Sequence, residues 1–181
     1  MTTIVATSGG LRFDLANPRP ADVSLLDIAR HLSSINRFNG ATWPRVNVAC
    51  HSIRVARSVQ SHGPRLFLLA LLHDAHEAYV GDITTPVRHV IGSTAIEDLT
   101  RRIDAAIYAA VGIDPPTAAE QAVIESADRA ALVEEWVWTL KNPPAAFCHG
   151  LGNGIEILDS LEAEAEFLKC FEAAAQRLGL R

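Results

Sequence analysis

The sequence has few cysteines, and their spacing indicates neither a disulfide framework nor a zinc site. Cys50, Cys148 and Cys170 lie far apart, and none belongs to a Cys-x-x-Cys pair. We find no secretory leader before them, and scattered, odd-numbered thiols are typical of a reducing compartment. We therefore expect a cytoplasmic protein without structural disulfides.

Long apolar runs are also missing. The strongest run, Leu66 to Leu72, stops at His73 and Asp74, whereas a membrane helix needs about 18 consecutive apolar residues. Hydrophobic residues nevertheless make up 49% of the 181 positions, which suffices for one well-buried domain. We predict a single soluble domain over residues 1–181, with no membrane partner.

Positive charge is scarce. The sequence has 16 Lys and Arg residues against 21 Asp and Glu residues, a formal net charge of -5. Because a polyphosphate backbone attracts basic surfaces, long nucleic acid is an unfavourable partner. A phosphate-binding P-loop is excluded as well, since no Lys-Ser/Thr pair follows the glycines of residues 150–154.

Two further catalytic patterns are incomplete. His76-Glu77 begins the His-Glu-x-x-His pattern of zinc proteases, but Val80 occupies the position of the second histidine. Cys50 stands beside His51, yet adjacency in sequence does not bring a base within hydrogen-bond reach of a thiol. Neither a zinc protease of that type nor a cysteine nucleophile is favoured.

The apolar periodicity predicts a mostly α-helical fold with a short N-terminal β-hairpin. Residues 2–15 alternate as two short strands around a Ser8-Gly9-Gly10 turn. Helical periodicity then predicts helices near 22–36, 47–61, 64–79, 94–111, 117–140 and 158–178. Residues 141–157, rich in Pro and Gly, form either a flap or an ordinary connection.

The third predicted helix carries polar residues where its apolar run ends. His73, Asp74, His76 and Glu77 follow within five positions, and burying such groups requires compensation. A divalent cation supplies it, because neutral imidazoles and carboxylates are its ligands. The alternative is a solvated helix end with a histidine whose ring nitrogens are already hydrogen-bonded.

Two other predicted helices each contribute one polar residue beside an apolar stripe. His51 opens the second, and Asp128 interrupts the apolar run of residues 127–133. Alone, His51 suits a capped or surface histidine, and Asp128 suits an ion pair with Arg129. Together with His73 and Asp74 they provide two imidazoles and two carboxylates, which balance a divalent charge of about +2 and leave positions for water and a phosphoryl oxygen.

The order of these residues resembles the HD-domain phosphohydrolases, and most closely the small bacterial and phage branch that includes 5'-deoxyribonucleotidases. The resemblance runs from about Gly10 to about Val133, with a motif core at about 22–140. It is carried by Asn-Val-Ala-Cys-His-Ser at 47–52, by the string His-Asp-Ala-His-Glu-Ala-Tyr-Val-Gly-Asp-Ile-Thr-Thr-Pro at 73–86, and by Asp128.

The resemblance implies an all-helical HD fold and one divalent metal ion held by His51, His73, Asp74 and Asp128. It also implies catalytic roles for Glu77 and Asp82 and a nucleotide contact for Arg37. The branch has Arg-Trp where this chain has Arg37-Phe38, and the spacing to His51 differs slightly. Since the position of His76 varies in the branch, it is not counted as a ligand.

Each of these further residues also has a plain structural interpretation. Glu77 suits a proton donor to the leaving oxygen or a surface glutamate, and Asp82 suits a catalytic group or a helix cap. Arg37 suits a bidentate phosphate contact, a role for which Arg45 and Arg88 compete. Phe38 and Trp43 suit stacking on a base or packing in a core.

These residues lead to three functional hypotheses. The first is hydrolysis of 2'-deoxynucleoside 5'-monophosphates, with manganese, cobalt, iron or zinc as the metal and magnesium possible. The second is a deoxynucleoside triphosphate triphosphohydrolase of the dATP type, which releases tripolyphosphate. The third is a non-catalytic nucleotide-binding module. In each the partner is a small nucleotide, and the long fifth and sixth helices offer faces for a homo-oligomer.

Overall fold

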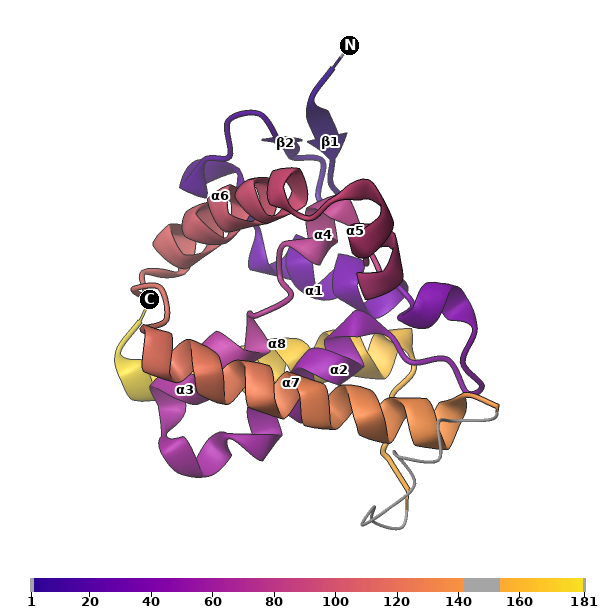
Figure 1. Ribbon diagram of the computed structural model, residues 1–181. Helices are drawn as coiled ribbons and strands as arrows, with labels where there is room; N and C mark the ends of the chain where they lie inside the picture. The colour runs from indigo at the N-terminus through magenta and orange to yellow at the C-terminus, as the bar shows by residue number, and fades with distance from the viewer. Residues whose placement is uncertain (1, 142–153, 181) are drawn as a thin grey trace.

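The chain begins with a two-stranded hairpin and is helical thereafter (Figure 1). A computed structural model describes residues 2–141 and 154–180. Strands β1 (Ile4–Ala6) and β2 (Arg12–Asp14) pair antiparallel, with Val5 opposite Phe13. Phe13 is fully buried and stacks on Tyr79 with 3.8 Å between ring centroids. The predicted class, mostly α with a short N-terminal hairpin, is confirmed.

The helices begin and end at local signals. Asn47 caps α2 by accepting a hydrogen bond from the Cys50 N–H at 2.8 Å. Thr117 and Glu120 form a capping box at the start of α7, which satisfies N–H groups that have no partner inside the helix. The described helices are α1 (Leu25–Ser34), α2 (Val48–Ser58), α3 (Pro64–Leu71), α4 (Glu77–Val80), α5 (Thr85–Ile91), α6 (Thr94–Val111), α7 (Ala118–Thr139) and α8 (Ser160–Leu178).

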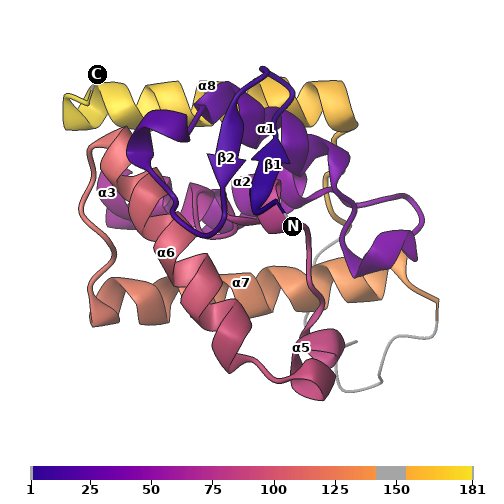
Figure 2. The same ribbon diagram turned by 90° about the horizontal axis from the view of Figure 1, so that it is seen from above.

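Helices α2 and α3 form the centre of the fold. Both pack against α8 on one side and α7 on the other, an arrangement visible in the two views (Figures 1 and 2). Helix α1 packs on α2 and α8, while α6 and the hairpin lie above them in Figure 1. Among the largest fully buried side chains are Ile28, Leu32, Ile53, Leu68, Leu69, Phe167 and also His51.

The prediction of one helix over residues 64–79 is wrong. Helix α3 ends at Leu71, and a turn separates it from α4. In this turn the Ala75 N–H bonds to Leu72 O at 3.0 Å and the Glu77 N–H to Asp74 O at 2.9 Å, so the bonds span three residues instead of four. The tighter winding matters for the site, because adjacent residues of a regular α-helix do not face each other.

The remaining predicted helices are confirmed, with each end within three residues of its predicted position. Helix α5 was not predicted, because it buries no residue and leaves Val90 86% exposed, so that no apolar stripe marks it. The predicted loop at 141–157, with Cys148 and most of the glycine-rich stretch 150–154, lies largely outside the described residues. Among those that are described, no helix has the length and apolar character that crossing a bilayer requires.

Candidate metal centre

Helix α2 places His51 at its first turn, facing inward. The side chain is completely buried, and its Nδ1 lies 2.9 Å from Oε1 of Glu135 on α7. Because a carboxylate only accepts hydrogen bonds, Nδ1 carries the hydrogen and donates it. The other ring nitrogen, Nε2, is left to face the space between α2, α7 and the turn after α3.

The turn after α3 directs His73 and Asp74 to the same point. His73 Nδ1 donates to the carbonyl oxygen of Ala70 at 2.8 Å, and its Nε2 lies 3.2 Å from Asp74 Oδ2. Asp128, in the middle of α7, approaches from the opposite side with a side chain 39% exposed. The three segments thus bring together residues that are far apart in the sequence.

All four predicted ligands converge. His51 Nε2 lies 3.0 Å from Asp128 Oδ1 and 3.7 Å from Asp74 Oδ2, and His73 Nε2 lies 4.0 Å from Asp128 Oδ1. Two donor atoms about 2.1 Å from a shared ion stand roughly 3–3.5 Å apart, so these separations are close to those of a coordination shell. His51, His73 and Asp74 each offer a ligand atom within 4.8 Å of the other two, so these three are positioned to hold a metal ion, and Asp128 lies beside them.

The protonation pattern supports this fit. His51 and His73 both use their Nδ1 hydrogen on an acceptor, and the buried Nε2 of each has no aligned hydrogen-bond partner, despite the short contact to Asp128. Burial lowers the pKa of His73, but the carboxylates of Asp74 and Asp128 outweigh burial and raise it to about 9. A proton or a cation is needed where imidazole nitrogens meet carboxylate oxygens, and a divalent cation serves both rings at once.

Arg37 reaches the same centre but is already paired. Its Nε donates to Glu135 Oε2 at 2.9 Å, and its Nη1 lies 3.7 Å from Asp74 Oδ2. Glu135 is fully buried and also lies 3.8 Å from the Nε of Arg54. Although burial raises the pKa of Glu135, His51 and Arg37 hold it below its ordinary value. The Arg37 charge is thus largely neutralised before any phosphate arrives.

Glu77 lies beside Asp74 at the start of α4. Asp74, His76 and Glu77 each offer a ligand atom within 4.8 Å of the other two. Burial and the charges of Asp74 and Asp82 raise the pKa of Glu77 to about 10, and burial also raises the pKa of Asp82. Glu77 therefore lies next to Asp74, and the charge of Asp82 acts on Glu77.

The predicted aromatic contacts differ in their relation to the centre. Phe38 follows Arg37 with a positive φ of 55°, and the Arg37 guanidinium lies 5.6 Å from the centroid of the Phe38 ring. The ring also packs edge-on against Trp136 at 6.1 Å. Trp43 is 82% exposed, so it lies on the surface and does not fill a core.

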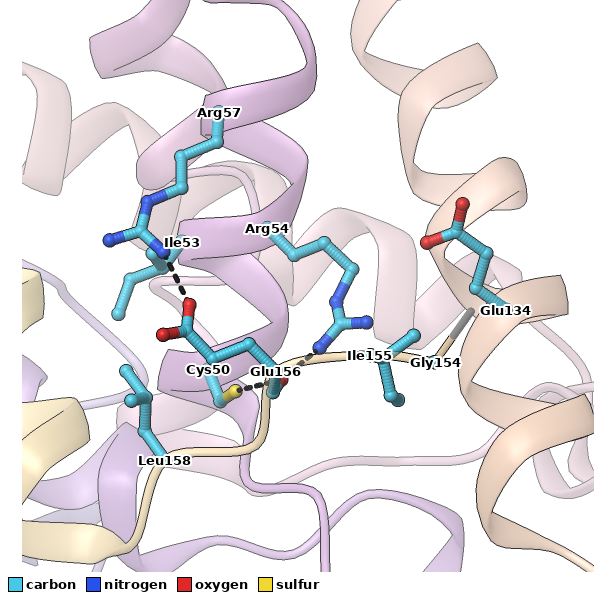
Figure 3. Close-up of a pocket in the computed structure, with 9 residues that line it drawn as sticks. All are labelled: Cys50, Ile53, Arg54, Arg57, Glu134, Gly154, Ile155, Glu156 and Leu158. Carbon is cyan, nitrogen blue, oxygen red and sulfur yellow. Dashed lines mark hydrogen bonds and ion pairs between the residues drawn. The ribbon is translucent and has the colours of Figure 1, made fainter. Parts of the chain in front are cut away.

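A pocket of about 230 Å³ lies between α2, α7 and the chain before α8 (Figure 3). Cys50, Arg54 and Arg57 of α2 point into it, opposite the segment around Glu156. Arg54 donates to the carbonyl oxygen of Glu156 at 2.6 Å, and Arg57 donates to its carboxylate at 2.8 Å. Since these arginines are occupied by local acceptors, the pocket joins α2 to the chain before α8 and holds none of the four candidate ligands.

The sequence analysis did not identify Glu135. It follows Asp128 by seven residues, which places both on one face of α7 about two turns apart. That spacing was the available signal. In the sequence, however, Glu135 is part of a Glu134-Glu135 pair that is typical of a solvated helix surface.

Fold and site together define a helical protein with a buried cluster of histidines and carboxylates that can hold a metal ion. No protein-family model matches the chain. An uncharacterized protein of Rhodobacter capsulatus is 41% identical over 110 residues, 58% of this chain and 56% of that protein. The uncharacterized protein YfdR of Escherichia coli (strain K12) is 32% identical over 114 residues, 62% of this chain and 61% of that protein. The chain thus aligns with less than two thirds of either relative, and neither name states an activity.

Proposed function

We propose that the protein is a metal-dependent phosphohydrolase of the HD-domain type that removes the 5'-phosphate from 2'-deoxynucleoside monophosphates. The observation that carries the proposal is the convergence of His51, His73, Asp74 and Asp128, with two imidazole nitrogens that lack aligned partners. Two neutral imidazoles and two carboxylates form an open ligand set, which leaves positions for water and a phosphoryl oxygen. The substrate class rests on the resemblance to the deoxyribonucleotidase branch.

The bound cation would supply an acidic water and polarise a phosphoryl oxygen. We assign the proton-transfer roles to Glu77, which offers a ligand-type oxygen within 4.8 Å of one of Asp74, and to Asp82. With its raised pKa, Glu77 holds a proton that it can donate to the leaving 5'-oxygen, a contribution of roughly 10²- to 10⁴-fold. Asp82 would act as the second carboxyl group of the reaction, and its charge contributes to the raised pKa of Glu77.

The phosphate and the base are assigned to the segment before α2. Arg37 presents Nη1 near Asp74, where a phosphoryl oxygen would meet a guanidinium geometry suited to it. Phe38 is held by Arg37 and Trp136, and the exposed Trp43 is available for stacking on a base.

The test is product analysis. Purified protein is incubated with each deoxynucleoside mono- and triphosphate in the presence of Mn²⁺, Co²⁺, Mg²⁺ or Zn²⁺, and products are separated by chromatography. Orthophosphate and nucleoside from monophosphates are expected. Tripolyphosphate from triphosphates would assign the chain to the triphosphohydrolases instead, and binding without any product would make it a nucleotide-binding module.

Variants test the division of roles. Asp128→Asn should lose both the cation and turnover, whereas Glu125→Gln, an exposed carboxylate on the same helix, should retain both. Glu77→Gln should keep the cation held by the four ligands and lose turnover by roughly 10²-fold or more. A Glu77→Gln protein with wild-type turnover would remove Glu77 from the reaction.

A further inference from the structure

Helix α4 carries Glu77 at its first position, yet hydrogen bonds of its own do not hold the Glu77 carboxyl group. The residue is 3% exposed and its Oε2 is buried without a partner, and none of the described residues donates a hydrogen bond to it. The helix has only four residues, and a helix of that length is not stable on its own. The place of the carboxyl group therefore depends on the contacts that fix the backbone of α4.

His31 on α1 makes the polar contact that joins α4 to the rest of the fold. Its Nδ1 lies 2.8 Å from the carbonyl oxygen of Ala78, the residue directly after Glu77. This oxygen is one of those that a helix end leaves without an intrahelical partner, and no backbone N–H of the described residues bonds to it. Because a carbonyl oxygen only accepts, Nδ1 carries the hydrogen and donates it.

The N-terminal hairpin holds the His31 ring in this tautomer. The Ser8 N–H lies 3.1 Å from His31 Nε2, and an N–H group can bond only to a ring nitrogen that carries no hydrogen. The turn is itself anchored on α1, since Ser8 Oγ and the Gly9 N–H donate to Asp27 Oδ1 at 2.8 and 2.6 Å. A single histidine, with both ring nitrogens bonded, therefore joins the hairpin to α4.

A second contact between the hairpin and α4 is apolar. Phe13 of β2 stacks on Tyr79 at an interplanar angle of 16°, and Tyr79 is only 5% exposed. Helix α4 thus lies between α1 and the hairpin (Figure 1). Both contacts act on the residues that follow Glu77, so that they fix the direction in which its side chain leaves the helix.

We propose that His31, held by the N-terminal hairpin, is a positioning residue whose bond to the Ala78 carbonyl oxygen keeps Glu77 in place beside Asp74. The consequence for turnover rests on the proposed function, in which Glu77 is the proton donor. A proton donor must stand within hydrogen-bond reach of the leaving oxygen, and a displacement of about 1 Å can cost roughly 10²-fold in rate. The hydrogen bonds of His31 reach Ala78 and Ser8, so it acts through the backbone of α4.

Two variants separate the two bonds of the ring. In His31→Asn an amide N–H group takes the position of Nδ1 and keeps the bond to Ala78. In His31→Gln the amide oxygen takes the position of Nε2 and keeps only the bond to Ser8. We expect His31→Gln to lower kcat roughly 10- to 100-fold, with KM and bound Mn²⁺ as in the wild type. His31→Asn should retain most of the wild-type kcat.

Two measurements show whether the effect passes through α4. Hydrogen–deuterium exchange, followed by mass spectrometry, should be about five-fold faster or more at residues 77–81 of His31→Gln, but not of His31→Asn. In a Glu77→Gln background, His31→Gln should lower kcat no further, because the group that it positions is gone. Thr3→Val is the matched control: it removes the exposed bond from Thr3 to Asp14 in the same hairpin and should change neither measurement.

Three results would overturn the positioning role: unchanged exchange at residues 77–81 in His31→Gln, faster exchange with wild-type kcat, or an equal loss of kcat in His31→Asn. The second of these would leave the proposed function standing. Faster exchange in a protein whose wild type releases no phosphate from any nucleotide would instead overturn the proposed function and leave the contact between His31 and α4. If His31→Gln does not fold, Phe13→Leu loosens α4 from the hairpin side and should show the same faster exchange and lower kcat.

Discussion

Glu135 offers the sharpest test of how the centre is built. Its carboxylate is fully buried, accepts hydrogen bonds from His51 Nδ1 and Arg37 Nε at 2.9 Å each, and lies 3.8 Å from Arg54 Nε. One side chain therefore fixes the tautomer of a candidate ligand and the position of a candidate phosphate contact. Glu135→Ala removes both supports, and Glu135→Gln preserves the shape but only one acceptor oxygen.

The size of the stability loss follows from the charges that stay buried when the Glu135 carboxylate is removed. Removing one partner of a buried ion pair costs about 3–5 kcal/mol, because the other charge stays buried without compensation. We expect Glu135→Ala to lower the free energy of unfolding by that amount. In Glu135→Gln the amide oxygen serves one donor while its N–H group faces the other, so a smaller loss of about 1–3 kcal/mol is expected.

Metal binding should weaken together with stability. Loss of a carboxylate that orients a metal-bound histidine typically lowers metal affinity roughly 10- to 100-fold, which corresponds to about 1.4–2.7 kcal/mol. This effect should be visible in Glu135→Gln, which we expect to fold. A residue that only stabilised the core would lower the unfolding free energy without moving the affinity of the folded protein for the metal.

The assays are urea unfolding of the metal-free protein, followed by circular dichroism, and calorimetric titration of the folded protein with Mn²⁺. Glu134→Gln is the control, since it alters a neighbouring glutamate of α7 that lines the pocket of Figure 3. If Glu135→Gln binds Mn²⁺ as tightly as Glu134→Gln does, the positioning role is refuted.

Further predictions concern the hairpin, a cap and the metal. Asp27 is buried and accepts hydrogen bonds from Ser8 Oγ and the Gly9 N–H; although burial raises its pKa, these bonds hold it below the ordinary value. Asp27→Asn should therefore lower the free energy of unfolding by about 1–2 kcal/mol at pH 7. The difference in unfolding free energy between wild type and variant should vanish as pH falls through the folded pKa of Asp27, below about 4. A constant difference down to pH 2 in urea titrations would contradict this. Gly9→Ala should cost roughly 1–3 kcal/mol, because its Cβ would lie 2.8 Å from Asp27 Oδ1, and an unchanged urea midpoint would show that the turn shifts freely. Thr117→Ala should cost about 1 kcal/mol through loss of the capping box, measured in the same way. When the free metal is at about 100 times its Kd, removing it with a chelator should lower the free energy of unfolding by about 2.7 kcal/mol and Tm by roughly 5–11 °C. An unchanged calorimetric Tm would count against a bound metal.

The sequence by itself determined the helical class, the hairpin and most of the helix limits. Apolar spacing reports which face of a segment is buried. Gly112 and the Pro115-Pro116 pair mark the end of one helix and Thr117 marks the start of the next, because these are local steric and hydrogen-bonding effects. It also identified His51, His73, Asp74 and Asp128, since polar groups beside apolar stripes stand out without knowledge of their partners.

Only the tertiary structure decided how those residues meet. The turn after α3 interrupts an apolar pattern that continues through Ala75 and Ala78, so periodicity alone could not reveal it. The pairing of Glu135 with His51 joins residues 84 positions apart, and the seven-residue spacing from Asp128 does not by itself show that Glu135 is buried. Burial and charge pairing depend on which helices lie side by side, and that is a property of the packed chain.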